Sequence, residues 1–91
     1  MIVRIATEGQ YQLPDDELER LNQLDDDVVA AVESADGAEF ARRLTALLDH
    51  ARSGQALDDD HLAPSDLILP PPDLTLDEAT HEFVGEGLIP D

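Results

Sequence analysis

Two apolar stripes at helical spacing, separated by a short link, constrain this chain more than any other feature. The first stripe recurs every three or four residues at Leu18, Leu21, Leu24, Val28, Val32 and Ala35. The second has the same spacing at Phe40, Leu44, Leu47, Leu48 and Ala51. This spacing places each set on one face of an α-helix. Because the link is short, we expect the two helices to pack antiparallel as a helical hairpin, stripe against stripe.

Local signals predict where these two helices begin and end. Pro14, which is favourable in a first helical turn, predicts a helix over residues 15–35. Asp36–Gly37 predicts its end, because glycine readily adopts the left-handed conformation that follows many helices. The second helix is expected over residues 38–52.

Short extended segments flank the predicted hairpin. β-Branched residues near the N-terminus predict a β-hairpin of residues 2–7 and 10–13, with a single strand followed by an extended segment as the alternative. Residues 66–69 predict a further strand, at a sheet edge because Pro70–Pro72 cannot donate ladder hydrogen bonds. Residues 55–65 are expected to form a loop.

The C-terminal part carries one specific helix signal. Thr75 and Glu78 match a capping box, which predicts a short helix through about Val84, followed by an apolar tail that packs down. The expected fold is α+β: a small single domain, residues 1–91, with an antiparallel helical hairpin packed on a small β-sheet. Seven residues are expected to be among the most buried: Leu21, Val28, Val32, Phe40, Leu44, Leu47 and Leu48.

The net charge of the chain restricts which kinds of molecule it can bind. The formal net charge is −17, with no lysine and five arginines. Such a surface repels phosphate backbones and anionic headgroups, so neither nucleic-acid binding nor direct membrane binding is expected. A basic protein would be attracted, although the acids could equally serve only solubility. The chain has no cysteine, and neither a signal-peptide pattern nor a membrane-spanning run is found, so we expect a cytoplasmic protein.

Catalytic and metal-binding patterns are lacking. Asp25 falls near the edge of the first apolar stripe, where it could be a shifted carboxylate; we expect it instead to reach water. His50, His61 and His81 do not form a helical zinc pair, and His50 and His81 are expected to be exposed. The run Asp58–Asp60 lacks calcium-loop spacing. With no nucleophile motif either, we expect no enzyme activity, no cofactor and no metal.

Three segments in order carry a family resemblance. They are residues 1–11 (MIVRIATEGQY), 64–71 (PSDLILPP) and 85–90 (GEGLIP), with the helical hairpin between the first two. Together they resemble the PspAA family of PspA-associated proteins. The resemblance implies a partner of PspA, a coiled-coil protein of the phage-shock group that protects stressed inner membranes. It implies an adaptor or regulator in the envelope-stress response, recruited to the cell membrane only through that partner, and no catalytic residues.

The expected contact surface is the acidic outer side of the first helix. Its inner side is used in packing, so Asp25, Asp26, Asp27 and Glu33 are the candidate partner-binding residues. An apolar strand edge at residues 67–69 is the alternative contact. A self-assembling homodimer through strand edges is the alternative function, and a small hydrolase or metal-dependent enzyme ranks last.

Overall fold

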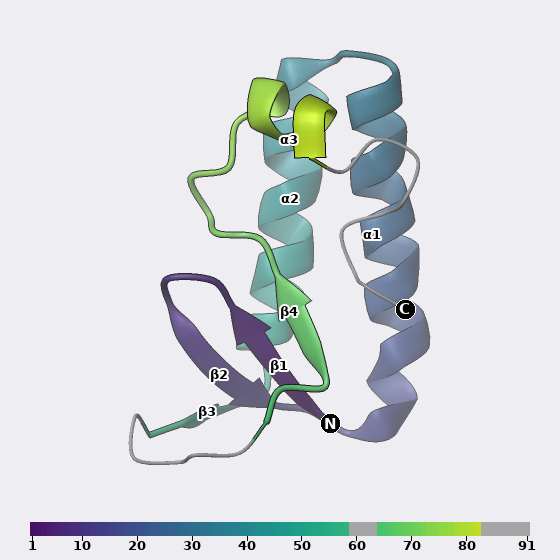
Figure 1. Cartoon of the computed structure of the whole chain (residues 1–91). Helices are drawn as coiled ribbons and strands as arrows, with labels where there is room; N and C mark the ends of the chain where they lie inside the picture. Colours follow the sequence, from purple (N-terminus) through teal and green to yellow (C-terminus); the bar gives the residue numbers. More distant parts are fainter. Residues whose placement is uncertain (59–63, 83–91) are drawn as a thin grey trace.

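The helical hairpin forms the long axis of the molecule. The computed structural model describes residues 1–58 and 64–82. In it, α1 (Leu18–Glu33) and α2 (Gly37–Arg52) run antiparallel, and a single 3₁₀ turn, η1 (Asp15–Glu17), leads into α1 (Figure 1). The predicted hairpin is confirmed, with slightly different bounds from those expected.

The turn between the helices differs from the prediction. Gly37 does not end α1; it is the first residue of α2, and Ala35 takes the left-handed conformation with φ 56°. The Asp36 N–H donates to the Ala31 carbonyl at 3.1 Å, which closes α1. The Asp36 side chain then caps α2 by accepting from the Glu39 N–H at 3.1 Å. Aspartate is a strong N-cap, so the second helix starts earlier and leaves alanine in the position that glycine prefers.

A mixed four-stranded sheet packs beside the hairpin. Its strand order is β3-β2-β1-β4, with β1 (Ile2–Ile5), β2 (Gly9–Gln12), β3 (Gln55–Leu57) and β4 (Leu67–Leu69). β1 and β2 form the predicted antiparallel hairpin, and β4 is the predicted edge strand. β4 pairs parallel with β1, so the chain passes through both long helices between these two strands.

The loop expected over residues 55–65 contains a strand. β3 pairs antiparallel with β2, with Ala56 opposite Tyr11. Its sequence, Gln-Ala-Leu, has no β-branched residue, so local propensity does not reveal it. Gly54 allows the pairing, because a Cβ atom there would lie 2.5 Å from the Gln12 carbonyl oxygen. Residues 59–63, with most of the acidic run and His61, lie outside the described residues.

The capping box is confirmed at the start of α3 (Leu76–Glu82). The Glu78 N–H donates to Thr75 Oγ1, and the Thr75 N–H donates to Glu78 Oε1, both at 3.2 Å. These two bonds satisfy amides that a helix N-terminus otherwise leaves unpaired. The expected end of this helix near Val84 and the apolar tail that follows lie outside the described residues, as does the side chain of His81.

The core lies between the hairpin and one face of the sheet. Val3, Ile5, Leu67 and Leu69 point into it, and the α+β architecture is confirmed. The seven helical residues expected to be most buried are all buried. Leu18, at the N-terminal end of the first stripe, is the first residue of α1 and is 41% exposed.

Candidate partner-binding surface

The four predicted contact residues on α1 have different environments. Asp26, Asp27 and Glu33 are exposed, whereas Asp25 is only 6% exposed. The expectation that Asp25 reaches water is wrong, because its position shares the helix face of Leu21, Val28 and Val32, which the rest of the core covers. A buried carboxylate is not available to a partner, so three of the four residues remain candidates.

Exposed acids on α1 form a line along the helix. Asp26 and Glu33 are seven residues apart, which places them nearly on the same side of an α-helix and about 10 Å apart along its axis. Glu19, also exposed, continues the line seven residues earlier. We call Glu19, Asp26 and Glu33 the acidic strip. Glu19 was not among the predicted residues, although the seven-residue spacing was available in the sequence.

Asp27 lies away from this strip, toward α2. The Arg43 Nη1 donates to the backbone carbonyl of Asp27 at 2.8 Å, and the Arg43 Nε donates to Glu39 Oε2 at 3.1 Å. Arg43 therefore connects the two helices and brings positive charge to the side of Asp27. In the described part of the chain, none of the strip carboxylates has an ion pair, so no arginine of this part occupies the strip.

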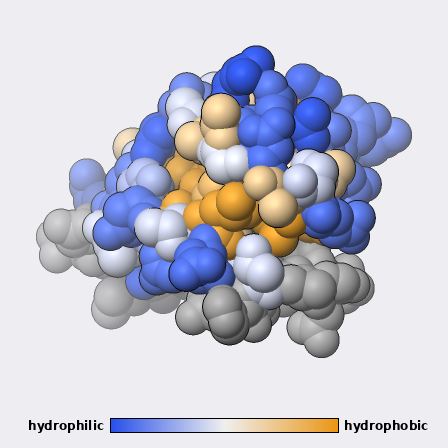
Figure 2. Space-filling view, turned by 90° about the horizontal axis from the view of Figure 1, so that it is seen from above, coloured by the Kyte–Doolittle hydropathy of each residue, from blue (hydrophilic) through white to orange (hydrophobic). Residues whose placement is uncertain are grey.

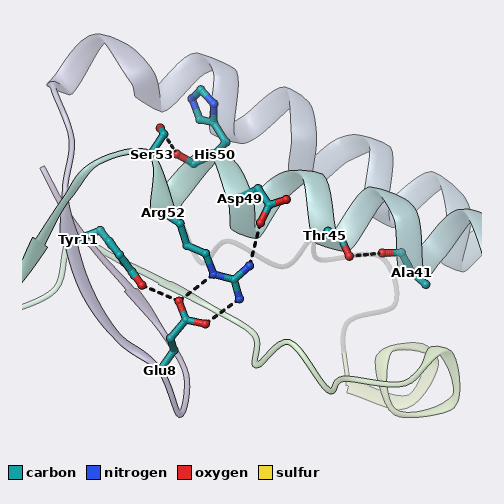
Figure 3. A network of polar contacts seen from close by, with 8 residues as sticks. All are labelled: Glu8, Tyr11, Ala41, Thr45, Asp49, His50, Arg52 and Ser53. Carbon is teal, nitrogen blue, oxygen red and sulfur yellow. Dashed lines mark hydrogen bonds and ion pairs between the residues drawn. The ribbon is translucent and has the colours of Figure 1, made fainter.

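A cluster of polar side chains joins the β1–β2 turn to the end of α2 (Figure 3). Arg52 donates from Nε and Nη2 to the two oxygens of Glu8, at 2.8 and 2.6 Å. The Tyr11 hydroxyl donates to Glu8 Oε2 at 2.7 Å, and Arg52 Nη1 donates to Asp49 Oδ1 at 2.9 Å. This two-pronged arginine–carboxylate contact is strong and directional.

The charges of this cluster are stable near neutral pH. The hydrogen bonds from Arg52, and then from Tyr11, lower the pKa of Glu8 to about 2. The bond to Glu8 raises the pKa of the Tyr11 hydroxyl, and the same carboxylate raises the pKa of Arg52. A general base needs a pKa near the working pH, so ionised Glu8 is poorly suited to proton transfer. The cluster is suited to attaching the sheet to the hairpin.

His50 and Ser53 lie close together but are not arranged as a nucleophile and its base. The Ser53 hydroxyl donates to the backbone carbonyl of His50 (Figure 3), and the His50 ring is directed instead at Glu17, with Nε2 2.7 Å from Glu17 Oε2. Nucleophilic catalysis needs the hydroxyl bonded to the imidazole nitrogen. His50 is half-buried, contrary to the expectation that it is exposed, because Glu17 at the start of the first helical segment packs against it.

Two further properties of the described residues concern metal binding and membrane insertion. Over residues 1–58 and 64–82, no group of three or more possible metal ligands occurs together. In the same residues, no helix is both long and apolar enough to cross a bilayer. Seen from the end that carries α3, the described surface is mostly hydrophilic around a smaller hydrophobic centre (Figure 2).

Comparison with known proteins identifies the family. The chain matches the PspAA family, described as PspA-associated protein, over residues 1–91, and this is not a known family of enzymes. No curated protein and no solved structure gives a match. Since the match spans the whole sequence, as the three segments predicted, the chain belongs to the PspAA family of PspA-associated proteins.

Proposed function

We propose that this protein is a non-catalytic adaptor or regulator that binds a PspA-type protein directly through the acidic strip of α1. Membership of a family of PspA-associated proteins carries this proposal. The strip supports it as the contact surface, because its three carboxylates are exposed and none has an ion pair within the described residues.

The spacing of the strip suits a helical partner. Glu19, Asp26 and Glu33 recur every seven residues. The outer positions of a coiled-coil helix also recur every seven residues, so a row of lysines or arginines on such a helix can face the strip over several turns. Complementary charges of this kind increase the association rate and select the partner.

The negative net charge of the protein also affects where in the cell we expect it to be. A net charge of −17 opposes direct contact with an anionic membrane. We therefore propose that the protein is cytoplasmic and reaches the inner face of the cell membrane, in the envelope-stress response, only when it is bound to its partner.

Isothermal titration of the protein into a purified PspA-type protein tests this proposal. We expect the double substitution Asp26→Lys with Glu33→Lys to weaken binding about tenfold or more at low salt. Asp16→Lys with Asp73→Lys is the matched control, because both residues are exposed, lie off the strip and change the net charge equally. Wild-type binding should weaken as salt rises, since exposed charges are screened within about 10 Å at 0.1 M salt.

Two outcomes would contradict the proposal in different ways. Absence of wild-type binding at any salt concentration would remove the adaptor role for this partner. Equal weakening by the strip and control substitutions would retain the partner but show that only overall charge matters, and not the strip.

A further inference from the structure

One face of the sheet is left open by the described elements. The hairpin covers the face that carries Val3, Ile5, Leu67 and Leu69 (Figure 1). Strand pairing places seven residues on the opposite face, in two rows: Leu57, Gln10, Arg4 and Ile68, then Gln55, Gln12 and Ile2. We call these seven residues the open face.

The open face differs in charge from the rest of the chain. None of its seven residues is acidic, although the chain has 22 aspartates and glutamates. Asp66, just before β4, borders the face and accepts from the Ile2 N–H at 2.7 Å. Ile68 is 51% exposed, more than any other large apolar residue in the described part. Gln10 Nε2 donates to Ser65 Oγ at 2.8 Å, so Ser65 lies against this part of the face. The face therefore combines one exposed and two half-buried aliphatic residues with neutral polar groups.

Arg4 is the one charged residue among these seven, and it is exposed. Arg20 donates to Gln23, Arg42 and Arg43 pair with Glu39, and Arg52 pairs with Glu8. Within residues 1–58 and 64–82, Arg4 has neither a hydrogen bond nor an ion pair of its side chain. An arginine beside aliphatic side chains can pair with a carboxylate from outside while its stem adds apolar contact.

The size of the face limits what can cover it. Strands of three and four residues in a four-stranded sheet give about 10–13 Å along the strands and about 15–20 Å across them. One α-helix with its side chains is about 10–12 Å wide. A stable protein–protein interface buries about 800 Å² per partner, several times this area, so the open face can supply only one part of an interface. A second copy would also bring another net charge of −17.

We propose that the open face binds one amphipathic helix of the PspA-type partner, with aliphatic residues against Ile2, Leu57 and Ile68 and a carboxylate on Arg4. This inference rests on the proposed function and adds a second contact to it. The acidic strip would speed the encounter through long-range charge, and the open face would slow dissociation through apolar contact. These two contributions respond differently to salt, because apolar burial is not screened.

Titration of the full-length protein into the purified PspA-type protein, in high salt, tests the open face apart from the strip. We expect Ile68→Asp to weaken binding about tenfold or more and Arg4→Glu to weaken it severalfold. Leu18→Asp and Arg20→Glu are matched controls, because they make the same changes at exposed positions of α1. Both controls should bind like the wild type under these conditions.

A milder substitution protects the test against misfolding. If circular dichroism shows that Ile68→Asp is unfolded, Ile68→Ser should still weaken binding while the fold is retained. Wild-type affinity in Arg4→Glu and in a folded Ile68 variant would overturn the inference and leave the proposed function in place. Absence of wild-type binding in high salt, with binding retained at low salt, would overturn the inference alone, and absence of binding at every salt concentration would overturn both.

Two further measurements test whether something other than a partner helix covers the open face. In sedimentation, a wild-type dimer that Ile68→Ser converts to a monomer would show that a second copy covers the face. In flotation with vesicles that contain phosphatidylglycerol, binding that Arg4→Glu abolishes would show that a membrane covers it. Either result would overturn the assignment to a partner helix.

Discussion

The buried side of the helical hairpin is mainly apolar, whereas the sheet is attached to the hairpin by a smaller apolar face together with a partly exposed pair of charged side chains. The helices contribute ten buried apolar residues: Leu21, Leu24, Val28, Ala31, Val32, Phe40, Leu44, Leu47, Leu48 and Ala51. The strands contribute four: Val3, Ile5, Leu67 and Leu69. The pair of Glu8 and Arg52 adds a charged contact at this second interface.

This difference indicates how each interface should respond to change. Apolar burial is insensitive to salt and to titration, and it depends on volume. A charged contact depends on pH and on salt, and it contributes less when water reaches it. Removal of large buried side chains should therefore destabilise the hairpin. The attachment of the sheet should be weakened by a change in backbone geometry at Gly54 or in the charge of Glu8.

Removal of a large side chain from the hairpin should have the largest effect. Phe40 is 2% exposed, so Phe40→Ala should lower the free energy of unfolding by about 3–5 kcal/mol. Leu18→Ala, at a residue that is 41% exposed, should cost much less. Urea denaturation measures both. An unchanged midpoint for Phe40→Ala would show that the hairpin interface is not the main source of stability.

Addition of a Cβ atom at Gly54, where the end of α2 meets the sheet, should lower the free energy of unfolding by an intermediate amount. At Gly54 it would lie 2.5 Å from the Gln12 carbonyl oxygen and 2.8 Å from Leu13 Cγ, so the backbone must move. We expect Gly54→Ala to cost about 1–3 kcal/mol.

Gly37→Ala is the matched control for this substitution. Its Cβ atom would meet only Leu76 Cδ2, at an ordinary 3.8 Å, and alanine is favourable in a helix. Thermal unfolding should show a lower midpoint for Gly54→Ala and an equal or higher one for Gly37→Ala. Equal effects at the two glycines would mean that β3 does not need the close approach.

Loss of the ion pair between Glu8 and Arg52 should have the smallest effect on the free energy of unfolding, and this effect should depend on pH. The pKa of Glu8 is about 2 in the folded state against an ordinary 4.5, so its ionised form favours folding. Its contribution is complete above about pH 4.5 and is lost as the pH falls toward about 2. Because 27% of the Glu8 side chain is exposed, we expect this contribution to be at most about 1 kcal/mol.

Comparison of the wild type with Glu8→Gln isolates this contribution from those of the other acids. The difference in unfolding free energy, from urea titrations at several pH values, should be largest near pH 6 and should vanish near pH 2. Asp49→Asn, which removes the more exposed partner of Arg52, should have a smaller effect at neutral pH. A difference that does not change with pH would assign the Glu8 effect to packing.

The sequence alone predicted the elements that depend on neighbours along the chain. The helical hairpin follows from spacing within each helix, and the capping box follows from two residues three positions apart. The edge position of β4 follows from the prolines after it. Three of the four candidate contact residues are exposed as expected, and Glu19 could have been added from the same helical spacing.

Only the tertiary structure decided the features that depend on residues far apart. Glu8 and Arg52 are 44 positions apart, and no local pattern links them. β3 forms because β2 lies beside it, and not because of its own residues. Asp25 is buried because the core covers a position that spacing placed at the edge of the stripe. Periodicity fixes the direction in which a side chain leaves its own helix, but burial and pairing depend on what packs against it.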